Sequence, residues 1–303
     1  MSLDTDAIID RGKLKRRLSA WRLVAIIAVA GAALAWIARD EGVIPRDHVA
    51  RISVDGLITE DTARERALAR VAEDSHARAL IVTINSPGGT VVGGENLYRA
   101  LRRVAEKKPV VAVMGTVAAS GGYMTAIGAD RIFARAGTLT GSIGVILQSA
   151  DVTGLLKKLG VEPEVIKSSP LKAVPNPLEP LTEEGRAATR AVVMDMYEQF
   201  VTMVAERRKL DPAAARNLAD GRVYTGRQAV DRRLIDAIGG EIEARDWLAK
   251  THKVAKSLPV RQIHVRDETG ELLGLAGRIV GKTLFSERLT LDGLVSVWHP
   301  DLN

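Results

Sequence analysis

The stretch from Val110 to Ala126 reads V-V-A-V-M-G-T-V-A-A-S-G-G-Y-M-T-A, and this order of residue types limits the local fold. The β-branched apolar run at its start predicts a buried strand, which Gly115 is expected to end. The apolar residues from Tyr123 onward predict the first turns of a helix. The stretch therefore predicts a strand, a tight turn and a helix, with the hydroxyl of Ser120 at the turn.

Strand patterns and helix patterns alternate along the middle of the chain. Short apolar runs predict further strands at 49–54, 79–84, 131–134, 139–146 and 164–167. Apolar residues at helical spacing predict helices at 61–77, 96–104, 152–159, 182–208, 211–218, 227–234 and 241–250. Loops are expected at 85–90, 220–226 and 168–180, and the last of these contains four prolines. This alternation is typical of an α/β fold built from stacked β-α units.

The longest predicted helix has one side rich in apolar residues, which we expect to pack on the core. These residues are Val192, Val193, Met196, Phe200 and Val204. Beyond it, residues 258–303 are basic and mixed in pattern, with a predicted strand at 258–265 and a predicted helix at 272–284. We interpret 258–303 as a C-terminal extension that packs on the domain rim, a partner subunit or the membrane surface.

The N-terminal part of the chain carries the pattern of a membrane anchor. Residues 1–22 are polar and rich in Lys and Arg, whereas residues 23–38 contain no charge. This apolar run is slightly shorter than the roughly 20 residues of a typical span, and Leu18, Ala20 and Trp21 extend it. The basic flank predicts a cytoplasmic N-terminus, so everything after the anchor would lie outside the inner membrane of a bacterium.

Cleavage of this apolar segment is the alternative, because Ala33-Leu34-Ala35 resembles a signal-peptide cleavage site. The apolar run continues past that site, which favours an uncleaved single-pass anchor. Residues 39–47 then form a charged linker, and residues 48–257 form the globular domain.

The composition excludes several classes of function. The 303 residues include no cysteine, so no disulfide, zinc-thiolate site or cysteine nucleophile is possible. The net charge of +6 is spread along the chain and aromatic content is only 4%. We therefore expect no nucleic-acid partner, although an anionic membrane surface would suit the basic excess.

Ser120 has the surroundings that a serine nucleophile requires. At a helix N-terminus, free N–H groups and the helix dipole favour developing negative charge, and small neighbours admit a substrate backbone. The N–H groups of Gly88, Gly89 and Gly121 are candidate oxyanion donors. A helix cap at Ser120 and a plain turn at the glycine pair are the alternatives without catalysis.

The base that activates such a serine is not obvious from residue types. None of the five histidines lies in a glycine-rich turn or beside a strand end that resembles a site. Lys172 lies among apolar residues and prolines, where burial could lower the pKa of its amine enough for it to act as a base. An exposed loop lysine is the alternative, and Lys167 is the rival base.

Five motifs, taken in order, resemble the signal peptide peptidase A family of membrane-bound serine proteases in its short, single-domain bacterial form. The motifs are Asn85-Ser86-Pro87-Gly88-Gly89, Ala118-Ala119-Ser120-Gly121-Gly122-Tyr123, Leu139-Thr140-Gly141-Ser142-Ile143-Gly144-Val145, the Lys167-to-Lys172 spacing, and Asp220-Gly221-Arg222-Val223-Tyr224-Thr225-Gly226. The resemblance covers about residues 48 to 250. It implies the spiral of ββα units shared by the caseinolytic protease and crotonase families.

The resemblance also implies roles for individual residues. Ser120 would be the nucleophile of a Ser/Lys dyad, Lys172 its general base, and Ser142 the residue that orients the lysine amine. Gly88 and Gly121 would donate to the oxyanion. Neither ATP nor a metal would be needed, so no cofactor is expected.

At the level of the whole protein, the resemblance implies a ring-like homo-oligomer, for which an octamer is one arrangement. Its dyads would be completed across subunit boundaries. The expected substrates are remnant signal peptides, cut in their apolar cores on the periplasmic side after signal peptidase has released them. A crotonase-like acyl-CoA enzyme, a silent membrane scaffold of the same fold and a protease of cytoplasmic proteins are the alternatives.

Overall fold

The computed structural model describes residues 17–18, 20–32, 46–265 and 294–297, and the chain divides into two compact units, 1–47 and 48–303. In the first unit residues 20–32 are helical, while 33–38 of the predicted anchor lie outside the described residues. Among the residues described, the structure contains no helix that is both long and apolar enough to span a membrane.

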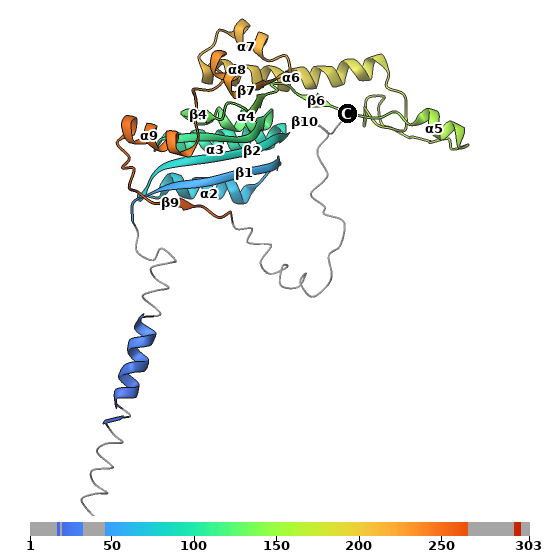
Figure 1. The fold of residues 1–303 in the computed structure, drawn as a ribbon. Helices are drawn as coiled ribbons and strands as arrows, with labels where there is room; N and C mark the ends of the chain where they lie inside the picture. The colour runs from blue at the N-terminus through green and yellow to red at the C-terminus, as the bar shows by residue number, and fades with distance from the viewer. Residues whose placement is uncertain (1–16, 19, 33–45, 266–293, 298–303) are drawn as a thin grey trace, which may run out of the picture. The chain divides into compact units, whose positions relative to one another are not determined.

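A mostly parallel sheet forms the centre of the second unit (Figure 1). Its parallel strands are β1 (His48–Ile58), β2 (Ala77–Thr90), β3 (Val110–Ala119), β4 (Arg131–Ala134) and β8 (Ala237–Ile238). The first four are connected in turn by α2 (Thr62–Glu73), α3 (Val91–Ala105) and α4 (Gly121–Ala126). Parallel strands need such crossover connections, and the predicted α/β class with stacked β-α units is confirmed.

Shorter strands extend this sheet at its edges and beyond its strand ends. β9 (Val260–Gln262) pairs in parallel with β1, and β5 (Leu139–Gly141) pairs in parallel with the end of β3. β7 (Val223–Thr225) is antiparallel to β5. β10 (Leu294–Val297) lies antiparallel between β2 and β6 (Ile146–Leu147).

Side chains of the central strands alternate between two apolar clusters, one on each face of the sheet. On β2, Leu80 and Val82 belong to the larger cluster, whereas Ala79 and Ile81 belong to the smaller. The larger cluster includes residues of α2, α3 and α4, and α9 (Glu241–His252) contributes Leu248 to the smaller one. A strand covered on both faces reads as a continuous apolar run, which explains the sequence pattern.

The helix α6 (Glu183–Arg208) is confirmed, but its predicted core face is only half right. Phe200 and Val204 are fully buried, whereas Val192 is 46% exposed. In the N-terminal half of α6 only Gly185 is buried. The remaining helices of this region are α7 (Pro212–Leu218) and α8 (Gly226–Asp231).

Two central strands are longer than their sequence predicts. β2 continues through the expected loop 85–90, since its last residues still pair with β1 and β10. β3 continues past Gly115, which faces Asn85, and Val117 donates its N–H to the Asn85 side chain. Pairing with neighbouring strands therefore outweighs the local preference of glycine and proline for turns.

Three other predicted elements differ from the structure or fall outside it. The predicted strand 164–167 is irregular, and Ile166 within it is 93% exposed. The predicted loop 220–226 contains β7, because β5 offers it an antiparallel partner. The predicted helix 272–284 lies outside the described residues.

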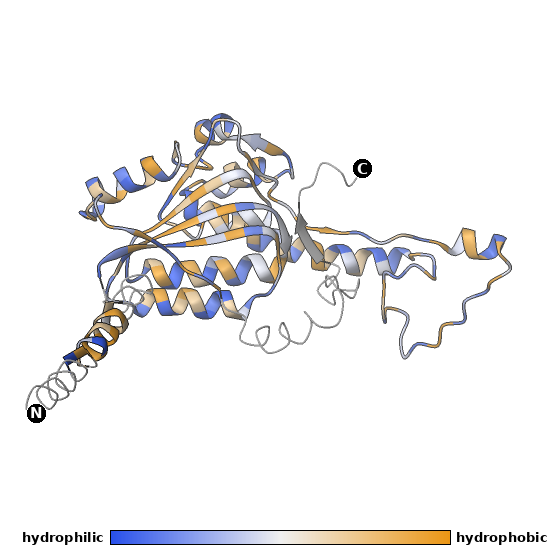
Figure 2. Cartoon of the chain, turned by 60° about the horizontal axis from the view of Figure 1, so that its bottom comes forward, coloured by the Kyte–Doolittle hydropathy of each residue, from blue (hydrophilic) through white to orange (hydrophobic). Residues whose placement is uncertain are grey.

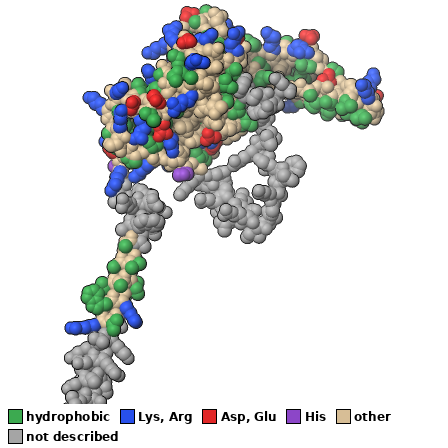
Figure 3. All heavy atoms as spheres, in the orientation of Figure 1, with side chains coloured by type: hydrophobic (Ala, Val, Ile, Leu, Met, Phe, Trp, Pro, Cys, Tyr) green, Lys and Arg blue, Asp and Glu red, His purple; other side chains and the backbone are tan. Residues whose placement is uncertain are grey.

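Residues 148–182, which we call the arm, extend away from the sheet (Figures 1 and 2). The arm contains the short helix α5 (Thr153–Lys158), which has no buried residue. Large apolar side chains of the arm are exposed, and hydrophobic side chains lie on its surface (Figure 3). They are Leu155, Leu159, Val161, Val165, Ile166, Leu171 and Leu178.

Candidate active site

Strand register brings several of the predicted site residues to one edge of the sheet. Ser86 of β2 lies opposite Ala118 of β3 in a parallel pair. Because these two strands run in the same direction, Gly88 and Ser120 lie at corresponding positions, each two residues beyond this pair. The carboxyl ends of parallel strands are where α/β proteins place their ligand sites.

Ser120 itself sits in the sharp turn that joins β3 to α4. Its φ of 54° lies in a region that side chains rarely adopt, which is common for residues at active sites. The residue is only 1% exposed in the single chain. Its N–H donates to the carbonyl oxygen of Gly141 at 2.8 Å, which links the turn to the end of β5.

Glycines beside Ser120 allow the turn to pack closely on its neighbours. A Cβ atom at Gly122 would lie 2.8 Å from the carbonyl oxygen of Ser86. A Cβ atom at Gly94 on α3 would lie 3.1 Å from the sulfur of Met124. The small residues of the motif are therefore required by the packing of α4 as well as by access to the serine.

Side-chain hydrogen bonds join α4 and its C-terminal end to distant parts of the chain. The Tyr123 hydroxyl donates to the Leu234 carbonyl oxygen at 2.8 Å, and burial raises the pKa of this phenol. Arg207 of α6 donates to the carbonyl oxygens of Ile127 and Ala129, both at 2.9 Å. The Arg207 bonds satisfy carbonyls at the end of α4, and together with the Tyr123 bond they fix the helix that follows Ser120.

Ser142 reaches the same edge through β5, which it follows directly. Its φ is 48°, and its N–H donates to the Arg222 carbonyl oxygen at 2.8 Å. The Asp220–Gly226 motif therefore supports the Ser142 loop through backbone contacts. Among the described residues, the Ser142 hydroxyl has no hydrogen-bond partner, and the residue is 8% exposed.

Gly88 has a partner that the sequence did not reveal. Its N–H donates to the buried Ser86 hydroxyl oxygen at 3.1 Å, and its φ of 118° suits only glycine. Ser86 belongs to a motif that we predicted to be a loop, so nothing in the pattern singled out its hydroxyl. A role of Gly88 as oxyanion donor requires exchange of this bond for one to the substrate.

Lys172, the predicted base, lies in the arm and not at the sheet edge. It is exposed, and its side chain makes no hydrogen bond or ion pair with a described residue. The rival base Lys167 forms an ion pair with Glu179. Within the described residues, the single chain therefore gathers Ser120, Gly88, Gly121 and Ser142 at this edge, while both candidate lysines lie in the arm.

A hydroxyl on a left-handed turn at the carboxyl ends of parallel strands, beside glycine N–H groups, is an arrangement that serine hydrolases of the α/β class can use. The pattern of the Clp protease family matches residues 48–148, in agreement with this fold. The pattern of Peptidase family S49 matches residues 102–255, about half of the chain. The chain therefore belongs to peptidase family S49.

Comparisons with individual relatives agree with this assignment. A Synechocystis protein provisionally named protease slr0021 is 43% identical over 206 residues, covering 67% of this chain and 74% of the relative. An Enterococcus faecium protein provisionally named signal peptide peptidase SppA is 32% identical over 265 residues, covering 83% of this chain and 76% of the relative. The chain is thus a serine peptidase of the signal peptide peptidase A family, which excludes the acyl-CoA alternative.

Proposed function

We propose that this chain is a membrane-anchored endopeptidase in which Ser120 of one subunit works with Lys172 of a neighbouring subunit. The observation that carries this proposal is the separation of the two residues in the fold. Ser120 lies in a well-packed turn, whereas Lys172 lies on an arm with exposed apolar side chains. A second copy of the chain would cover these side chains and bring the amine to the serine.

The proposed reaction follows from the groups at the sheet edge. Ser120 Oγ attacks the carbonyl carbon of the substrate while its proton passes to the neutral amine of Lys172. The N–H groups of Gly88 and Gly121 stabilise the oxyanion, and Ser142 Oγ orients the lysine amine. The amine leaving group takes the proton from Lys172, and water then hydrolyses the acyl-enzyme by the same proton route.

The backbone beside Gly88 supports an extended peptide as the substrate. Gly88–Thr90 of β2 and residues 146–147 of β6 both accept an antiparallel strand, β10, between them. A substrate segment bound in the same manner would be held by main-chain hydrogen bonds, which do not depend on its sequence. This mode suits apolar peptides, which offer few polar side chains for recognition.

The substrates that we propose are remnant signal peptides on the outer face of the membrane. The basic segment 1–22 and the uncharged segment 23–38 support an anchor with a cytoplasmic N-terminus. The globular unit would then lie on the periplasmic side of a bacterial inner membrane. In this proposal the substrates are apolar, identical subunits assemble into a ring, and no cofactor takes part.

Mixing two inactive variants tests whether the dyad is shared between subunits. Full-length Ser120→Ala and Lys172→Ala are each expected to lose hydrolysis of an apolar peptide while keeping their assembly state. If the two variants are dissociated and reassembled together, about one quarter of random interfaces would pair an intact serine with an intact lysine. We therefore expect activity to return to roughly a quarter of the parent value.

The remaining outcomes separate the parts of this proposal. Failure of the mixture to regain activity, with mixed assembly demonstrated by two affinity tags, places both residues of the dyad in one subunit. Activity in Lys172→Ala alone means that the base is another residue. Activity in Ser120→Ala means that the nucleophile is another residue.

A further inference from the structure

The arm has little apolar core, so specific polar contacts must determine the shape of the loop that carries Lys172. Helix α5 buries none of its residues, and Ile166 just before the loop is 93% exposed. Hydrophobic burial, which fixes most segments of a folded chain, is therefore weak here. Polar contacts within the loop take the place of hydrophobic burial.

An ion pair between Lys167 and Glu179 closes the loop around Lys172. The Lys167 side chain is 13% exposed and that of Glu179 is 31% exposed, whereas lysines are almost never buried unless paired. The hydrogen bond from Lys167 and a second one from Asn176 hold the pKa of the Glu179 carboxyl below its usual value. The carboxylate thus has two donors from two different points of the loop.

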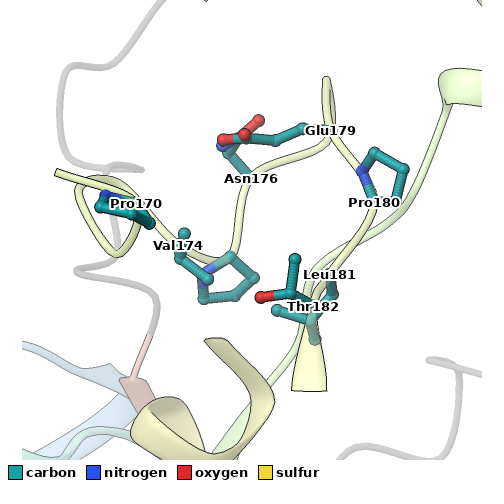
Figure 4. A pocket seen from close by; sticks show the side chains of 8 residues that line it. Pro170, Val174, Asn176, Glu179, Pro180, Leu181 and Thr182 are labelled. Atoms are coloured by element: carbon teal, nitrogen blue, oxygen red, sulfur yellow. The ribbon is translucent and has the colours of Figure 1, made fainter. Parts of the chain in front are cut away.

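Asn176 extends this contact to the backbone beside Lys172. Its side-chain amide donates to Glu179, beside which it lies in Figure 4, and also, at 2.9 Å, to the carbonyl oxygen of Ala173. Its side-chain oxygen accepts the N–H of Leu178 at 2.9 Å. Ala173 directly follows Lys172 and has a φ of 60°, a conformation that needs support in a residue with a Cβ atom.

The loop is also seated on the start of α6. Val174 packs so closely there that a Cβ atom at Gly185 would lie 2.6 Å from its Cγ1 atom. Thr182 caps α6 by accepting the N–H of Gly185 at 3.1 Å. Val174 and Thr182 line a small cavity of about 30 Å³ together with Pro170 and Leu181 (Figure 4). The loop is thereby joined to a long helix that is firmly packed at its other end.

We infer that Lys167, Asn176 and Glu179 form a positioning cluster that fixes the backbone of the Lys172 loop, and that Lys167 is a support for the general base and not the base itself. This inference rests on the proposed role of Lys172 and adds three residues to the site. A general base must be neutral and free to accept a proton. The Lys167 amine is engaged in an ion pair with Glu179, whereas the Lys172 amine has no bond to a described residue.

Kinetics of the full-length chain in detergent test this inference. Lys167→Met and Glu179→Gln are expected to lower kcat for an apolar peptide about 10–100-fold, with little change in KM, because a misplaced catalytic group slows chemistry more than binding. Lys167→Arg keeps the charge and should retain most of the activity. The double variant should be no worse than Lys167→Met, since both changes break one contact.

A surface ion pair elsewhere supplies the matched control. Lys107 is paired with Glu73, and both side chains are exposed at 49% and 72%. Lys107→Met should therefore behave as the parent. The pH dependence of kcat adds a readout that loss of folded protein cannot mimic. Its midpoint should shift in Lys167→Met, because the surroundings of the Lys172 amine change.

Each contrary outcome has a distinct meaning. If Lys167→Met and Lys167→Arg are both as inactive as Ser120→Ala while Lys172→Ala is active, Lys167 is the base and the inference is wrong. If Lys167→Met and Glu179→Gln match Lys107→Met in kcat and in pH midpoint, the cluster does not position the loop. If Lys172→Ala keeps full activity while Lys167→Met loses activity, the proposed dyad is wrong as well. The assignment of the chain as a serine peptidase would still stand.

Discussion

The backbone N–H of Ser120 donates a 2.8 Å hydrogen bond to the carbonyl oxygen of Gly141, the residue that directly precedes Ser142. The two serines are thereby joined through main-chain atoms of paired strands, since Ala119 lies opposite Gly141 in the β3–β5 register. This link runs through main-chain atoms and not through the Ser142 hydroxyl. Replacing the Ser142 hydroxyl should therefore change the chemistry of the site while the main-chain link is kept.

Ser142→Ala is expected to lower kcat about 10–100-fold while the free energy of unfolding stays close to that of the parent. The hydroxyl is proposed to orient the amine of Lys172, and its loss lets that amine sample unproductive positions. Ser142→Thr, which keeps a hydroxyl, should retain more activity than Ser142→Ala. Steady-state hydrolysis and urea unfolding measure the two effects separately, and a large loss of stability in Ser142→Ala would contradict the argument.

Gly122→Ala is expected to destabilise the chain by about 1–3 kcal/mol, because overpacking at a rigid contact forces backbone shifts. The added methyl group would lie 2.8 Å from the Ser86 carbonyl oxygen. It would also push Ser120 away from β2, so activity should fall with stability. Gly137→Ala is the control, since a Cβ atom there meets nothing within 4 Å. Equal unfolding midpoints in urea for the two variants would show that the close contact is not limiting.

Tyr123→Phe should cost about 1–2 kcal/mol of stability, because the buried Leu234 carbonyl oxygen loses its donor. The ring keeps its packing in the core, so the change isolates one hydrogen bond. Thermal or urea unfolding gives the difference directly. Tyr98→Phe on α3 is the comparison, and a loss of stability in this variant as large as in Tyr123→Phe would argue against a specific role for the Leu234 contact.

The sequence predicts the strands of the sheet correctly where the local residue pattern alone determines where a strand begins and ends. The run at 131–134 gives a strand with those bounds, whereas β2 and β3 extend through Gly, Pro and Asn residues. In the extended parts the backbone pairs with a neighbouring strand that is distant in the sequence. Such pairing is a tertiary effect, and a window of adjacent residues carries no information on it.

The sequence predicts which residues belong to the candidate site, but not the hydrogen-bond partners that support them. The motif order led to Ser120, Gly88, Gly121 and Ser142, and the register of β2, β3 and β5 places them at one edge. Three partners escaped the sequence because they act through single polar atoms in segments without periodicity. They are the Ser86 hydroxyl, the Arg222 carbonyl and the Asn176 amide.

The contribution of Glu179 to stability should depend on pH in a defined direction. Hydrogen bonds from Lys167 and then Asn176 lower the pKa of its carboxyl below the ordinary value of 4.5. Because the folded pKa is below the unfolded one, the stabilisation is present above the unfolded value and is lost as the pH falls through the folded value. The difference in Tm between the parent and Glu179→Gln should therefore be largest near neutral pH and should approach zero at acidic pH.

A glutamate without such contacts supplies the control for this pH dependence. The Glu183 side chain is 92% exposed and lies 3.6 Å from the Arg186 guanidinium. Near neutral pH, Glu183→Gln should lower Tm less than Glu179→Gln does. A gap for Glu179→Gln that does not narrow at all as the pH falls below 4.5 would mean that the charge of Glu179 is not what stabilises the loop.

Ile166→Asp is expected to weaken assembly without weakening the fold of the single chain. Ile166 is 93% exposed on the arm, so the single chain gains nothing from it. If a neighbouring subunit covers the arm, the aspartate would be a buried charge without a partner, which strongly disfavours association. Sedimentation velocity in detergent should show smaller particles, and peptide hydrolysis should fall because the proposed dyad needs two subunits. Ile242→Asp on α9, at a residue that is 71% exposed, is the matched control and should keep the parent's size and activity. Assembly of Ile166→Asp at the parent's size would mean that this side chain of the arm faces solvent in the oligomer, and the contact would have to be sought elsewhere on the arm.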